Sequence, residues 1–99
     1  MNTFVPSINN TREKILDILE RTFTPQSCQL DDESALHAGH AGAASGGGHF
    51  RLHMVSTRFE GLNLVSRHRL VYDAVRNLMQ SEIHALAITA LTPSEANAA

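Results

Sequence analysis

The run from residue 49 to residue 76 constrains the fold of this chain more than any other segment. In its first half Phe50, Leu52 and Met54 alternate with polar residues, which is the pattern of a strand with one buried face. A turn over 59–61 follows, and apolar residues then recur at helical spacing: Leu64, Val65, Val71, Tyr72, Val75, Leu78 and Met79. Because a strand with one apolar face needs a covering layer, this run predicts half of a small two-layer domain.

The segments on either side complete an α-β-β-α-β order with a final short helix. The first helix follows Asn10, which stands three residues before Glu13 as in a capping box, and it stops at Thr24-Pro25. The last helix carries a second such box, Thr92-Pro93-Ser94-Glu95. The sequence predicts strands over 27–32, 49–56 and 83–91, and a helix over 63–80 between the last two.

This element order predicts an α+β fold, a two-layer α/β sandwich with a three-stranded mixed sheet. The strands over 49–56 and 83–91 are joined by a helix, so we expect them to be parallel. The segment 83–91 is apolar on both faces, which is typical of an inner or well-covered strand. The 99 residues form one domain, with 1–9 as a disordered lead-in and 33–48 as a flexible loop rich in glycine, alanine and histidine.

Composition limits the classes of function. The formal charge of −2 argues against a protein that grips nucleic acid by bulk charge, although a local basic patch is compatible with it. No segment has the length of a membrane span, and no basic segment leads into an apolar one at the N-terminus, so we expect a cytoplasmic protein with no membrane contact. The single cysteine, Cys28, is expected to be a small buried hydrophobe on the inward side of a strand.

Histidines form the first candidate site. His37 and His40 lie in the predicted loop, and His84 stands at the start of the third strand; imidazole is a common ligand of zinc, copper and iron. The alternative for the loop pair is two solvated side chains. The alternatives for His84 are a half-buried side chain bonded to nearby backbone and an exposed one placed to be a ligand.

A basic cluster forms the second candidate site. Arg67-His68-Arg69 lies near the start of the predicted helix, where the helix dipole favours anions. The alternative is a solvated helix face paired with Glu60 or Asp73. No serine has the context of a nucleophile elbow or triad, and no phosphate-binding glycine pattern occurs, so we expect a protein that is not an enzyme.

Several motifs resemble the BolA family in order and spacing. They are Phe59-Glu60-Gly61, Arg67-His68-Arg69-Leu70-Val71-Tyr72, Ile83-His84-Ala85-Leu86-Ala87-Ile88 and Thr92-Pro93-x-Glu95. The resemblance covers nearly the whole chain. It implies a fold similar to the KH domain of the second topology.

The resemblance implies an adaptor that binds a monothiol glutaredoxin and shares a 2Fe-2S cluster with it, in iron–sulfur trafficking or iron regulation. His84 would be one ligand and His37 the other, with His40 as the alternative; the partner would bring cysteine and glutathione. The isolated chain would be a monomer without the cluster, and the complex a heterodimer.

The family also implies a DNA-binding transcriptional regulator of stress response and cell morphology. The surface for DNA or a partner would then comprise Arg58, Arg67, His68, Arg69 and Arg76. KH domains clamp nucleic acid with a Gly-x-x-Gly loop, whereas the corresponding turn here has one glycine, Gly61. Ala96 also replaces an aromatic residue common in relatives, so we expect weak packing of the last helix.

Overall fold

The computed structural model describes residues 11–34 and 47–98, and it has the predicted α-β-β-α-β-α order. The lead-in over 1–9 and both loop histidines, His37 and His40, lie outside the described residues. None of the helices in the described part is long and apolar enough to cross a membrane. The elements are α1 (Thr11–Phe23), β1 (Ser27–Asp32), β2 (Gly48–Val55), η2 (Thr57–Phe59), α3 (Leu64–Ala74), α4 (Arg76–Ser81), β3 (Ile83–Leu91) and α5 (Pro93–Asn97).

The sheet has the strand order β1-β2-β3, with β1 antiparallel and β3 parallel to β2. This confirms the mixed three-stranded sheet and the parallel pair on either side of the helical crossover. Of the two alternatives for residues 83–91, an inner strand or a well-covered one, the inner position is wrong, because β3 is an edge strand. Its outward positions include Ala87 and Thr89, which are exposed, and small side chains of this kind do not require a second cover.

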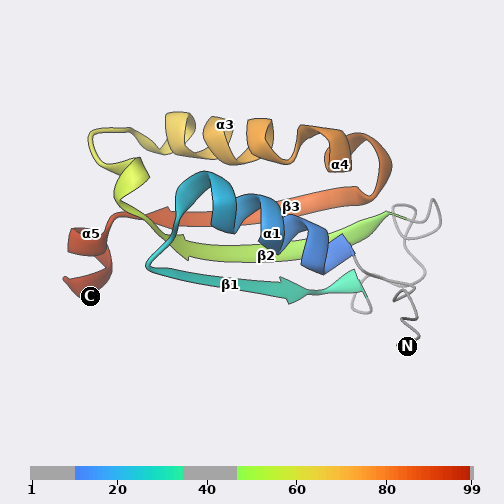
Figure 1. Ribbon diagram of the computed structural model, residues 1–99, viewed down its shortest axis with the longest axis horizontal. Helices are drawn as coiled ribbons and strands as arrows, with labels where there is room; N and C mark the ends of the chain where they lie inside the picture. The colour runs from blue at the N-terminus through green and yellow to red at the C-terminus, as the bar shows by residue number, and fades with distance from the viewer. Residues whose placement is uncertain (1–10, 35–46, 99) are drawn as a thin grey trace, which may run out of the picture.

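One face of the sheet carries the core. Ile15 and Leu19 from α1 and Leu52 and Met54 from β2 have no exposed surface, and Val71 from α3 joins them. The opposite face is open, as the alternating burial along β2 shows. Figure 1 shows α3 and α4 running along β3, with α1 in front of the strands. The two-layer arrangement is therefore as predicted.

The predicted helix over 63–80 is two helices. Val75 has φ −105° and ψ 19°, and this non-helical residue separates α3 from α4. The side of α3 that meets the core carries Arg67 and Val71, so Leu64 and Val65 are exposed at 63% and 59% rather than buried as their spacing suggested. Tyr72 is also on the surface, and its hydroxyl donates to the Leu86 carbonyl at 2.7 Å.

A compact turn joins β2 to α3. Ser56 is buried; its hydroxyl donates to the Phe23 carbonyl at 2.8 Å and accepts from the Arg58 amide, which begins η2. Gly61 has φ +80°, a conformation that side-chain-bearing residues rarely adopt, and Asn63 caps α3 through its side chain. The predicted turn over 59–61 is confirmed, and it fixes the position of Arg58 relative to the end of α1.

Candidate functional site

His84 is positioned by an irregularity in the parallel pairing of β2 and β3. Gly48 pairs with Ile83, whereas His49 pairs with Ala85, so His84 is an extra residue in β3. Strict alternation would place residue 84 on the same face as Leu86, which is buried. The bulge releases His84 from that face, and its side chain is exposed. Of the two alternatives for His84, the structure has the exposed one.

His49, at the start of β2, lies beside His84. The two ring centroids are 5.0 Å apart, with 40° between the ring planes. His49 is half-buried and its Nε2 atom is shielded from solvent. No local pattern in the sequence indicated this neighbour, because the contact depends on the register of two strands that are distant along the chain.

The residues at both ends of the predicted histidine loop contact His49 or His84. On one side, the Ser34 hydroxyl accepts from the His49 amide at 3.1 Å. On the other, Gly47 lies so close to His84 that a Cβ atom on it would be 2.6 Å from the His84 Cβ. The segment that contains His37 and His40 therefore starts and finishes next to the His49–His84 pair. Figure 1 shows the end of β1 and the starts of β2 and β3 at the opposite end of the domain from α5.

A hollow of about 220 Å³ adjoins His84, between the end of α4 and the start of β3. Glu82 lies on its wall and receives hydrogen bonds from Thr11 at 2.7 Å and Lys14 at 2.9 Å. These bonds, that from Thr11 first, lower the pKa of Glu82 below its ordinary value. Thr11 and Lys14 belong to α1, so these bonds attach the backbone just before His84 to that helix.

The described residues do not hold a metal ion on their own. Within 11–34 and 47–98, no three histidine, cysteine, aspartate or glutamate side chains come together for one. Cys28 is half-buried, and burial raises the pKa of its thiol, so it is poorly suited to be a ligand. Exposed His84 can offer one imidazole nitrogen, and a set of three or more ligands would need side chains from the loop or from another molecule.

Only some of the residues in the predicted basic surface are exposed to solvent. Arg58, Arg69 and Arg76 are exposed, and Arg76 pairs with Asp73 at 2.9 Å. His68, the remaining member, is half-buried.

Arg67 does not belong to this surface, because its side chain is 7% exposed and turned inward. Its guanidinium binds Glu95 with contacts of 2.6 and 3.0 Å and also donates to the carbonyls of Leu62 and Ala90. For Arg67, the alternative of a solvated helix face paired with Glu60 or Asp73 is wrong, since this side chain is buried and its partner is in the last helix. The predicted capping box at Thr92 is confirmed, and it orients Glu95 for this pair.

The protein is a small α+β domain with a three-stranded mixed sheet and an exposed histidine, His84, at a bulge in its edge strand β3. The chain matches the family model described as BolA-like protein over residues 19–95, and it belongs to that family. It is similar to the BolA domain of SufE1 from Arabidopsis thaliana, with a TM-score of 0.78 and 38% identity, covering 90% of this chain and 99% of that one.

The chain is also similar to two further proteins. Protein BOLA1, chloroplastic, of Arabidopsis thaliana is 40% identical over 92 residues, which are 90% of this chain and 58% of that protein. The DNA-binding transcriptional regulator BolA of Escherichia coli K12 is 36% identical over 84 residues, covering 85% of this chain and 77% of that protein. The chain thus spans less than two thirds of its Arabidopsis relative.

Proposed function

We propose that this protein is a non-enzymatic adaptor that binds a monothiol glutaredoxin and co-ligates a 2Fe-2S cluster as shared cargo. His84 is the proposed ligand from β3, and His37 or His40 is the proposed ligand from the loop. The observation that carries the proposal is the position of His84: it is exposed, and both ends of the histidine-bearing segment lie next to it.

The chemistry of the available donors supports a shared site rather than a complete one. Imidazole nitrogen is an established ligand of iron in two-iron clusters. The described residues provide one exposed imidazole beside a half-buried one, and no third ligand of the usual kinds. A cluster would therefore depend on thiolates from a partner, which a glutaredoxin and glutathione supply. The isolated chain is expected to be a monomer that does not retain the cluster.

The test is anaerobic reconstitution with iron, sulfide, glutathione and a monothiol glutaredoxin from the same source. The adaptor function predicts co-elution of the two proteins and a visible circular dichroism spectrum different from that of the glutaredoxin homodimer. Reconstitution of the glutaredoxin alone, under the same conditions, is the control. A spectrum identical to the homodimer's, together with separate elution, would contradict the proposal.

A second candidate function is direct DNA binding in transcriptional regulation. The name of the Escherichia coli relative favours it, as do the exposed guanidinium groups of Arg58 and Arg69, which have no ion-pair partner within the described part of the chain. Arg67 is excluded from this surface because it is buried against Glu95.

Titration against duplex DNA at several salt concentrations tests this function. If Arg58 and Arg69 contact phosphates, affinity rises steeply as salt falls, and each Arg→Gln change lowers the salt slope by about 0.9. Arg21→Gln is a suitable control because Arg21 is already paired with Asp17. Absence of binding at low salt removes this candidate without affecting the adaptor proposal.

A further inference from the structure

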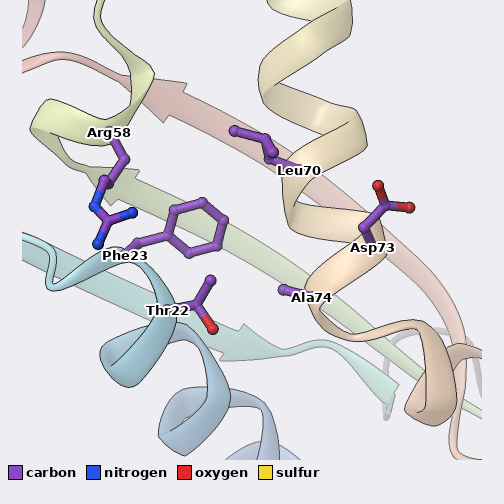
Figure 2. Close-up of a pocket in the computed structure, with 6 residues that line it drawn as sticks. All are labelled: Thr22, Phe23, Arg58, Leu70, Asp73 and Ala74. Atoms are coloured by element: carbon purple, nitrogen blue, oxygen red, sulfur yellow. The ribbon is translucent and has the colours of Figure 1, made fainter.

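A second pocket, of about 340 Å³, lies where the end of α1, η2 and α3 meet. It shares no residue with the hollow beside His84. Neither the cluster-sharing proposal nor the DNA proposal explains its apolar interior. Its lining residues, drawn in Figure 2, are Thr22, Phe23, Arg58, Leu70, Asp73 and Ala74.

The pocket is held in shape by buried contacts. The Phe23 ring, only 2% exposed, packs against Phe59 with ring centroids 5.3 Å apart. The buried Ser56 hydroxyl joins the Phe23 carbonyl to the start of η2, which carries Arg58. The end of α1 and η2 are therefore held together before any ligand binds, and a preorganised site loses less free energy on binding.

The charges that line the pocket are not balanced. The Asp73 carboxylate is engaged by Arg76 at 2.9 Å, and Figure 2 shows it turned away from Phe23. Arg58, in contrast, lines the same pocket, and its guanidinium makes no ion pair or side-chain hydrogen bond with any described residue. The pocket thus combines an apolar wall with one uncompensated positive charge at its rim.

We propose that this pocket binds a small carboxylate with an apolar body of about the size of a phenyl ring. The apolar body would cover Leu70, which is 40% exposed, together with Ala74 and the edge of Phe23. The carboxylate would pair with Arg58, whose planar guanidinium can bind both oxygens at once. The volume is at the lower end of the range for ligand pockets, which favours a compact ligand over an extended chain.

The experiment is an NMR titration of the full ¹⁵N-labelled chain with 4-phenylbutyrate and, as the matched neutral probe, 4-phenylbutan-1-ol. The proposal predicts saturable shifts of the Phe23, Leu70 and Ala74 amides. It also predicts that the carboxylate binds about tenfold more tightly than the alcohol, because only the carboxylate can pair with Arg58. No saturable shift at about 10 mM, or equal affinity for the two probes, overturns it.

Two variants test whether Arg58 is the residue that pairs with the carboxylate of the ligand. Arg58→Gln should reduce the affinity for 4-phenylbutyrate to about that of the alcohol. Arg69→Gln, which changes an exposed arginine outside the pocket, should leave it unchanged. Equal weakening by both changes would mean that only net charge matters and would overturn the proposed pairing.

A third probe separates a small molecule from a protein segment. The acetylated peptide amide Glu-Phe-Glu presents the same apolar and acidic groups on a backbone. Binding of this peptide at the same residues, but about tenfold more tightly than 4-phenylbutyrate, would overturn the small-ligand class in favour of a partner's acidic segment. Equal or weaker binding supports the small carboxylate.

Discussion

The imidazole rings of His49 and His84 lie 5.0 Å apart at the point where the parallel strands β2 and β3 go out of register. The extra residue in β3 is His84 itself, so the bulge that exposes the side chain also places it against His49. Bulges of this kind commonly re-aim a side chain beside a functional site. The arrangement leads to predictions about His84 that do not depend on a bound cluster.

His49→Ala should loosen the His84 ring, whereas His49→Phe should keep it in place, because phenylalanine preserves a ring at that position. The measurement is the line width and chemical shift of the His84 imidazole signals in the isolated protein. We expect a large change for the alanine variant and a small one for the phenylalanine variant. Equal changes in both would show that ring packing does not position His84.

Gly47→Ala should displace His84 or the chain that approaches it. The new Cβ would be 2.6 Å from the His84 Cβ and 3.1 Å from its backbone nitrogen, so the backbone has to move. We expect a loss of about 1–3 kcal/mol in the free energy of unfolding, typical of overpacking, and shifted His84 signals.

Gly61→Ala is the matched control for this change. Gly61 has φ +80° with open space around its Cβ position, so alanine there costs about 1–2 kcal/mol through backbone strain alone. Its effect should not reach the His84 signals. Similar shifts of these signals in both glycine variants would argue that they report general loosening of the fold rather than the Gly47 contact.

Arg67→Met should destabilise the domain by about 2 kcal/mol, because it leaves the Ala90 and Leu62 carbonyls without their charged donor. It should also release α5, whose link to α3 is the Arg67–Glu95 pair. Urea unfolding measures the first effect, and amide hydrogen exchange of α5 the second. Arg69→Met, on the exposed side of the same helix, should change stability by less than about 0.5 kcal/mol.

The Arg67–Glu95 pair makes the stability of the fold depend on pH in the acidic range. Hydrogen bonding from Arg67, and then from the Thr92 backbone, lowers the pKa of Glu95 from 4.5 to about 2. A carboxylate whose pKa is lowered in the folded state stabilises the fold above its unfolded pKa, and this contribution is lost as the pH falls from about 4.5 to about 2.

Glu95→Gln and Arg67→Met should each flatten the fall in stability across that interval, measured by urea unfolding at a series of pH values. Glu82, whose pKa is also lowered, should account for part of the slope that remains. An acid-side slope that is unchanged in both variants would contradict the role given to the pair.

Local signals in the sequence predicted the order of elements well. The stop at Thr24-Pro25, the capping box at Thr92 and the alternation from Phe50 to Met54 depend on neighbouring residues, and each is confirmed. The fold class follows from them, since a helix between two strands supplies the crossover that parallel pairing needs.

The burial of Arg67 and the place of His49 in the candidate site depend on tertiary contacts, which the sequence alone did not predict. Arg67 is buried because its partner, Glu95, is in another helix, and no local pattern distinguishes it from its exposed neighbour Arg69. His49 became part of the candidate site through a one-residue shift in strand register. The assignment of His37 or His40 as a ligand stays a prediction, as do the glutaredoxin partner and the cellular compartment.

Ligation by His84 is tested by the visible circular dichroism of the heterodimer reconstituted with the His84→Ala variant. His53→Ala is the matched control, because His53 is an exposed histidine near the end of β2, away from the bulge at Gly48/His49. Ligation by His84 predicts a changed spectrum and faster loss of the cluster in the first variant, and wild-type behaviour in the second. A spectrum and a rate of cluster loss identical to wild type with His84→Ala would contradict the account.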